Sequence, residues 1–250
     1  MRAAFALSIA VALGACAATP AGPGSASDYA AALADPARPE TDRARDAARK
    51  PGELLAFAQV AKGEKVGDYI MGGGYLTRVL AGAVGPQGKV YAFQPDEFIA
   101  YRPAYGEEQK AATAPYANVV ALRGPIAAPP FPEPLDTIVT VQNLHDLYIG
   151  AMPQGSGPKG MAALFAALKP GGTLLMVDHS AKDGSGTAAT DATHRIDRQF
   201  AVAAAQAAGF VLEAQSDLYA APADPRDANV FSPQIRGRTD QFTLRFRKPK

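Results

Sequence analysis

The sequence predicts an α/β fold whose core is a doubly wound, mostly parallel sheet. The clearest evidence is residues 66–95, where a short apolar run, three glycines, a helical pattern and a second β-rich run follow one another. Two strands joined by a crossover helix form a right-handed parallel unit. Helical patterns separate most of the later β-rich runs, as in alternating β and α units. These runs occupy residues 118–122, 135–141, 174–177, 210–218 and 240–247.

Apolar spacing predicts helices at residues 98–112, 161–168 and 193–208. Residues 125–134 contain five prolines and are expected to be irregular. The connection 219–239 is long for a compact domain, and loops of that length are usually functional or disordered.

A glycine bend, Gly72-Gly73-Gly74, joins the first strand to the first crossover helix. Without a Cβ atom, the backbone at such a bend can approach a ligand closely. The competing interpretation is that the glycines only let the helix pack against the sheet, and the bend alone does not decide between the two.

The same stretch resembles motif I of the class I S-adenosylmethionine (SAM)-dependent methyltransferases, D-x-G-x-G-x-G. Asp68, Gly72 and Gly74 match this pattern, whereas Ile70 stands at its first glycine. Gln94 stands where the family has the acidic residue that holds the ribose hydroxyls. Its amide can accept and donate hydrogen bonds, but without the assistance of a charge.

The string 168–178, LKPGGTLLMVD, resembles the turn and fifth strand of the same family, and the resemblance covers about residues 50–250. It implies a seven-stranded doubly wound sheet, mostly parallel, with an antiparallel last strand. It also implies SAM as the cofactor, bound by Asp68, Gly72, Gly73, Gly74, Gln94 and Gln142.

Polar residues follow two of the predicted strands. Strand 135–141 runs into Gln142-Asn143-Leu144-His145-Asp146, and strand 174–177 runs into Asp178-His179. In an open α/β sheet, ligands bind beyond the carboxyl ends of the strands. In many class I methyltransferases, substrate and methyl donor meet after the fourth strand. The predicted catalytic residues are therefore Asn143, His145, Asp146 and His179, although each could instead cap a loop.

The chain has three histidines, His145, His179 and His194. If the methyl acceptor is a hydroxyl group, a nearby base would help to remove its proton. The imidazoles suit such a base, or a metal site completed by Asp146 or Asp178. Because their spacings are long and no H-x-x-x-H pair occurs, we predict that there is no metal site.

The N-terminus resembles a bacterial lipoprotein signal: Arg2 precedes a short apolar run, and Leu13-Gly14-Ala15-Cys16 resembles a lipobox. We expect a signal peptide at 1–16, a lipid on Cys16, a flexible tether at 17–27 and a methyltransferase-like domain at 28–250. The domain would begin with a helical extension, whose charged part at 40–50 is expected to be a solvated helix face. These features predict a lipid-anchored protein of the cell envelope that faces the periplasm.

The formal net charge is +1 and no basic patch with interleaved aromatic residues occurs, which argues against nucleic acid as a partner. The predicted function is a SAM-dependent methyltransferase that acts on a small-molecule or envelope substrate. The alternative is a degenerate methyltransferase fold that binds a ligand or partner without catalysis, which Ile70, Gln94 and export from the cytosol favour. An NAD(P) enzyme fits less well, because its fingerprint would need glycine in place of Thr77.

Overall fold

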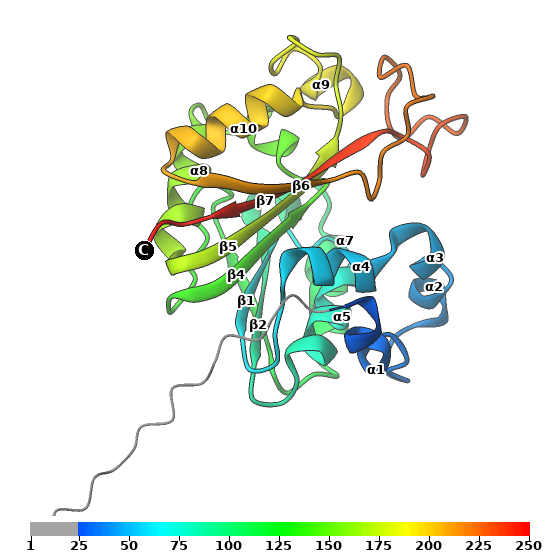
Figure 1. Cartoon of the computed structure of the whole chain (residues 1–250), viewed down its shortest axis with the longest axis vertical. Helices are drawn as coiled ribbons and strands as arrows, with labels where there is room; N and C mark the ends of the chain where they lie inside the picture. Colours follow the sequence, from blue (N-terminus) through cyan, green and yellow to red (C-terminus); the bar gives the residue numbers. More distant parts are fainter. Residues whose placement is uncertain (1–24) are drawn as a thin grey trace, which may run out of the picture.

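The computed structural model describes residues 25–250, and its core is one seven-stranded sheet with helices on both faces (Figure 1). The strand order is β3-β2-β1-β4-β5-β7-β6. β7 pairs antiparallel with β5 and β6, whereas the remaining neighbours pair in parallel. The predicted doubly wound sheet with an antiparallel last strand is confirmed. The predicted signal peptide, Cys16 and most of the predicted tether lie outside the described residues.

The strands agree with the β-rich runs of the sequence, except that the fifth strand is much longer than residues 174–177. Their bounds are β1 Lys65–Tyr69, β2 Lys89–Pro95, β3 Val119–Gly124, β4 Leu135–Val141, β5 Leu168–His179, β6 Val211–Ser216 and β7 Gln241–Arg247. The strand order reverses between β1 and β4, which are hydrogen-bonded neighbours. Ligands of open α/β sheets bind at such a switch point.

Helices cover both faces of this sheet, with α8 and α10 on one face and α4, α5 and α7 on the other (Figure 1). The longer helices are α4 Pro51–Ala58, α5 Tyr75–Val84, α6 Asp96–Tyr101, α7 Ala104–Thr113, α8 Ser156–Ala167 and α10 Arg198–Ala207. The short ones are η1 Ala26–Tyr29, α1 Ala30–Leu33, α2 Glu40–Arg43, α3 Asp46–Arg49, η2 His145–Tyr148 and α9 Thr190–Thr193. Within residues 25–250, no helix combines the length and apolar character needed to cross a bilayer.

The two faces of the sheet have separate apolar cores, which the alternation along β5 makes clear. Leu174 and Met176 pack with Met161 of α8, whereas Leu175 and Val177 pack with Leu80 of α5 and its neighbours. Successive side chains of a strand point to opposite faces, so a strand buried on both sides reads as one continuous apolar run. This burial fixes the register of β5 and with it the position of Asp178 and His179 at its end.

The single helix predicted at 98–112 is wrong, because the structure has two helices there, α6 and α7. Arg102 lies between them in an extended conformation, with φ −139° and ψ 95°. It precedes Pro103, and the proline ring disfavours a helical conformation in the residue before it.

The helix predicted at 193–208 is also wrong at its start. His194 ends the short helix α9 in a left-handed conformation, and Ile196 forms a β-bridge with Ser180. α10 begins only at Arg198, where the side chain of Asp197 accepts a hydrogen bond from the backbone N–H of Gln199. The helix predicted at 161–168 begins earlier than expected, at Ser156.

The charged segment at 40–50 is mostly exposed, as predicted for a solvated face, but one of its charged residues is an exception. Asp42 is buried, and its carboxylate pairs with Arg78 of α5 at 2.7 Å. The neighbouring Arg38 is also buried and pairs with Asp46 at 2.6 Å. Arg78 in turn donates to the carbonyl oxygen of Gly73 at 2.9 Å. The N-terminal helices are therefore anchored to the start of α5, directly beside the glycine bend.

Candidate active site

The glycine bend contains two glycines that the fold requires and one that it does not. Gly72 and Gly74 have φ of +55° and +79°, a region that residues with a side chain rarely adopt. A Cβ atom on Gly74 would lie 2.3 Å from the Cβ atom of Ala112 in α7. A Cβ atom on Gly73 would meet only Glu108 Oε2, at 3.8 Å. Gly73 is exposed, so its backbone is the part of the bend that a ligand can approach.

Ile70 occupies the glycine position of the motif and adopts a glycine-like conformation, with φ +62°. A β-branched residue there is strained, by about 1–2 kcal/mol. Its side chain is buried, and its carbonyl oxygen accepts a hydrogen bond at 2.9 Å from Asn143 Nδ2. This bond joins the ends of β1 and β4 across the switch point, so the structure brings Asn143 and the glycine bend together.

Asp68 lies inside the protein rather than at its surface. Its carboxylate accepts a hydrogen bond at 2.5 Å from the hydroxyl of Thr77 in α5. Burial raises the pKa of Asp68 to about 6, and the hydrogen bond from Thr77 opposes that rise. In this structure Asp68 attaches α5 to β1, and its predicted contact with the cofactor stays a prediction.

The side chain of Gln94, the predicted ribose ligand, is buried inside the protein. It is 0% exposed, and neither its amide oxygen nor its amide nitrogen has a hydrogen-bond partner. Buried polar groups are nearly always hydrogen-bonded, so an unpartnered amide at this position points to a missing partner. A ribose can reach it only after the covering side chains move.

The loop after β4 holds the predicted residues Gln142 and Asn143. Gln142 is left-handed, with φ +63°, and its Nε2 donates to Gln241 of β7 at 3.0 Å. Asn143 Nδ2 donates to Val141 O at 2.8 Å as well as to Ile70 O. Both N–H groups of Asn143 are thus used within the protein, and they fix the loop to the end of β1.

His145 and Asp178 form a buried pair at the carboxyl edge of the sheet. Asp178 Oδ1 lies 2.8 Å from His145 Nδ1, and Asp178 Oδ2 accepts from the His145 backbone N–H at 2.8 Å. Burial alone would lower the pKa of His145, but the charge of Asp178 and the hydrogen bond between them raise it to about 9. Burial would raise the pKa of Asp178, but His145 holds it below its usual value. The pairing thus favours the protonated form of His145, and Nε2 must lose a proton before it can act as a base or as a ligand.

Two further groups face His145, and only one of them was among the predicted catalytic residues. Asp146 Oδ1 lies 3.4 Å from His145 Nε2, and burial raises the pKa of Asp146 to about 6. His194 Nδ1 lies 3.3 Å from the same nitrogen. The sequence pointed to His194 only as one of three histidines that suit a base or a metal site, and His194 was not among the predicted catalytic residues. Its place follows from the bridge between Ser180 and Ile196, which no local pattern shows.

His179, a predicted catalytic residue, stands apart from this group. Its Nδ1 lies 2.8 Å from the hydroxyl of Thr239, and its ring centre lies 6.4 Å from that of His145. Burial lowers the pKa of His179 to about 4, so the ring is neutral at neutral pH. It neighbours the pair formed by His145 and Asp178, but its catalytic role stays a prediction.

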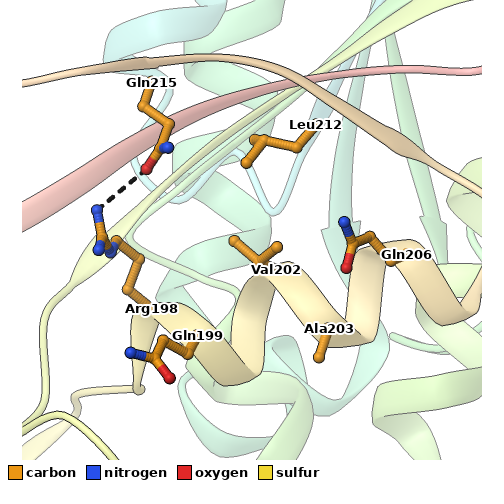
Figure 2. Close-up of a pocket in the computed structure, with 7 residues that line it drawn as sticks. All are labelled: Arg198, Gln199, Val202, Ala203, Gln206, Leu212 and Gln215. Atoms are coloured by element: carbon orange, nitrogen blue, oxygen red, sulfur yellow. Dashed lines mark hydrogen bonds between the residues drawn. The ribbon is translucent and has the colours of Figure 1, made fainter.

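Two surface hollows lie away from the glycine bend. One, of about 250 Å³, lies between α10 and β6, where Arg198 donates to Gln215 at 3.0 Å (Figure 2). Its lining of amides, one arginine and alkyl groups holds no nucleophile or acid. The other, of about 420 Å³, is lined by residues 147–150 and 152–158, and its lining begins two residues after His145.

A scan against models of known protein families finds no match for this chain. A SAM-dependent methyltransferase from Aquifex aeolicus is similar in structure, with a TM-score of 0.58, 19% identity, and coverage of 90% of this chain and 99% of that one. The glycopeptide N-methyltransferase MtfA, complexed with sinefungin, has a TM-score of 0.55 at 14% identity and covers 81% of this chain and 87% of its own. The [4+2]-cyclase SpnF has a TM-score of 0.57 at 14% identity, with 86% of each chain covered. The chain therefore has the class I methyltransferase fold, although one protein that shares it is named a cyclase.

Proposed function

We propose that this protein is a SAM-dependent methyltransferase. The observation that carries the proposal is the glycine bend at the switch point, where exposed Gly73 has open space beside it and Asn143 links the bend to the polar loop after β4. The fold comparison supports it, because one similar structure holds sinefungin, an analogue of SAM. The methyl acceptor would be a small molecule or a component of the cell envelope.

The residues present fit SAM at two points. The backbone of Gly72, Gly73 and Gly74 offers close approach, and the unpartnered amide of Gln94 offers hydrogen bonds to a ribose once it is uncovered. SAM, when bound, supplies a sulfonium methyl group, and the protein's main contribution to its transfer is alignment of the reacting groups. Here the pairing with Asp178 fixes the orientation of the His145 ring, which is the kind of restraint that alignment requires.

The test is isothermal titration of the purified full-length chain with SAM and with S-adenosylhomocysteine. Gly73→Ala should leave stability unchanged, because its Cβ atom meets nothing closer than 3.8 Å, and should weaken binding at least tenfold if the ligand approaches this backbone. Gly150→Ala is the matched control, since its Cβ atom would lie 3.5 Å from Asp191 and far from the bend in sequence. Equal affinity in both variants would contradict the assignment of the site.

The alternative function is a degenerate fold that binds another ligand without methyl transfer. It is favoured by the complete burial of Gln94 and by Ile70 in the glycine position. SAM binding separates the two functions: a parent protein that binds neither SAM nor S-adenosylhomocysteine at millimolar concentration would support the degenerate fold. Gln94→Asp should not restore binding by itself, because an aspartate buried at this position would be protonated or destabilising.

The proposed location is the cell envelope, with a lipid on Cys16, and the lipobox-like sequence is what supports it. Labelling cells with a lipid precursor should mark the parent protein and leave Cys16→Ala unmarked. Equal labelling, or equal membrane association of the two proteins, would remove this part of the proposal.

A further inference from the structure

Two histidines and an aspartate gather beside the loop after β4, although they are far apart in the sequence. The ligand atoms of His145, Asp146 and His194 all lie within 4.8 Å of one another. We propose that His145 Nε2, an Asp146 carboxylate oxygen and His194 Nδ1 bind one Zn²⁺ ion. The proposal rests on this geometry and not on the methyltransferase activity proposed above.

The free nitrogen of His145 is directed to this point by Asp178. Asp178 accepts hydrogen bonds from the backbone N–H groups of His145 and His179, which shows that its oxygens act as acceptors. Its third contact is His145 Nδ1 at 2.8 Å, so that ring nitrogen carries the proton. In the neutral ring the lone pair then lies on Nε2. Histidines that bind metals commonly donate their other ring N–H to a carboxylate in this way.

The distances between the ligand atoms fit a tetrahedral ion. Nε2 of His145 lies 3.3 Å from His194 Nδ1 and 3.4 Å from Asp146 Oδ1. Two ligand atoms that are each about 2.0–2.1 Å from a tetrahedral Zn²⁺ are separated by about 3.3–3.4 Å. Two of the three separations thus match those around such an ion, and the third pair, His194 and Asp146, lies within 4.8 Å.

His194 is held in place by the long connection between β6 and β7. The backbone N–H of Val230 donates to Thr193 O at 3.2 Å, and Asn229 Nδ2 donates to Ala192 O at 2.9 Å. The ring of Phe231 packs edge-on against His194, with centres 4.9 Å apart. His194 itself adopts φ +54° and ψ 47°, a conformation that this packing maintains. The connection therefore presents one imidazole to the other, which gives a structural role to a loop of unusual length.

The set of donor atoms selects the type of ion. Two imidazole nitrogens and one carboxylate suit Zn²⁺ and neighbouring transition metals, whereas Mg²⁺ and Ca²⁺ prefer oxygen ligands. With three protein ligands the ion keeps one coordination position for water or for a donor atom of a substrate. His145 and Asp146 are buried, and His194 is partly exposed.

A direct hydrogen bond between the two imidazoles is the competing explanation for the 3.3 Å distance. In that case a proton stands where the metal would be, and Asp146 Oδ1 is only a neighbouring charge. The two explanations differ in what the protein does with Zn²⁺, and that difference can be measured without SAM or a methyl acceptor.

The experiment uses the purified full-length chain after treatment with a chelator. Titration calorimetry and metal analysis after dialysis should find one Zn²⁺ per chain, and the same titration with Mg²⁺ should show binding at least tenfold weaker. Zn²⁺ at about 100 times its dissociation constant should raise the melting temperature by about 5–10 °C. Co²⁺ in place of Zn²⁺ should give visible absorption bands typical of a tetrahedral site.

Two variants and one control decide the outcome. His194→Ala, at a partly exposed position, and Asp146→Asn, which keeps the shape of the side chain, should each weaken Zn²⁺ binding at least tenfold and abolish the Co²⁺ bands. His179→Gln also removes a histidine, but one whose Nδ1 contacts Thr239, and should bind Zn²⁺ as the parent does. The proposal is overturned if the parent binds no Zn²⁺, or if Asp146→Asn and His194→Ala bind it as tightly as the parent.

Discussion

Replacing Gln94 with methionine tests whether the buried amide of Gln94 is a binding group for a ligand. Methionine has a similar length and volume but no polar group to satisfy, so the change removes two polar atoms that lack partners. A buried unsatisfied group costs about 1–3 kcal/mol, and a swap that conserves volume costs under about 1.5 kcal/mol. We therefore expect Gln94→Met to raise the free energy of unfolding by about 1–2 kcal/mol. At about 2–4 °C per kcal/mol, the melting temperature should rise by about 2–8 °C.

Gln109 provides a control of the same residue type and the same complete burial. Its Nε2 donates to Ala92 O at 3.0 Å and to Leu122 O at 2.8 Å, and its Oε1 accepts from Arg123 Nε at 2.7 Å. Gln109→Met loses all three hydrogen bonds and should lower the free energy of unfolding by about 2–4 kcal/mol. The two substitutions are chemically identical, so opposite signs can come only from their surroundings.

Urea unfolding of the parent and both variants measures these effects, first without ligand and then with SAM. If the amide binds the ribose, SAM at about 100 times its dissociation constant stabilises the parent by about 2.7 kcal/mol, and Gln94→Met loses most of that gain. A Gln94→Met protein that is less stable than the parent would show that the amide already has partners, and the reasoning from its missing hydrogen bonds would fail. A variant that gains as much from SAM as the parent would refute the ribose contact.

Three further predictions follow from single contacts. Burial raises the pKa of Glu64 from 4.5 to about 7, although the hydrogen bond from Thr137 opposes this rise. The folded protein therefore binds this proton more tightly than the unfolded chain does. Because of this difference, the free energy of unfolding falls as pH rises from about 4.5 to about 7. Glu64→Gln should remove that pH dependence and raise the free energy of unfolding at pH 8 by about 1–2 kcal/mol, after allowance for partial exposure. Equal unfolding curves of the parent at pH 5 and pH 8 would contradict this prediction. Arg195→Ala leaves the carboxylate of Asp224 without its charged partner at 2.8 Å and should lower the free energy of unfolding by about 3–5 kcal/mol. A loss below about 1 kcal/mol would show that the pair does not hold the β6–β7 connection. Gly74→Ala should lower the stability of the fold by more than about 1 kcal/mol, because its Cβ atom would lie 2.3 Å from the Cβ atom of Ala112. Thermal melts measure this effect. A melting temperature equal to that of Gly73→Ala would argue against the required left-handed conformation of the bend.

The parts of the fold that depend on local pattern could be predicted from the sequence. The unit from β1 to β2 has short-range apolar spacing and a glycine bend, and strands buried on both faces, such as β4, appear as continuous apolar runs. The rule that strand ends meet at one sheet edge also predicts that Asn143 and Asp178 lie at the edge that holds the bend. In the structure Asn143 bonds to Ile70 at the end of β1, and Asp178, at the end of β5, bonds to His145.

The parts that depend on distant partners could not be predicted. His194 lies in a segment with helical spacing, but contacts with Asn229 and Phe231, more than 30 residues later, hold it in a left-handed conformation beside His145. Asp42 belongs to a charged run that resembles a solvated face, and only its pairing with Arg78 shows why it is buried. Nothing in the residues around Gln94 indicates that its amide is sealed without a partner.

The hydrogen bonds of Asn143 restrict the chemistry of any substrate that meets it. Its amide nitrogen donates to Ile70 O and Val141 O, and this pair of bonds holds the strained Ile70 against the loop after β4. Among the residues that the structure describes, no group donates to its amide oxygen, so the side chain of Asn143 can contact a substrate only as a hydrogen-bond acceptor. A methyl acceptor aligned by this side chain must therefore present an N–H or O–H group, as amines and alcohols do. An acceptor without such a group would have to bind elsewhere along this edge, because turning the amide would break the bond that joins β1 to β4.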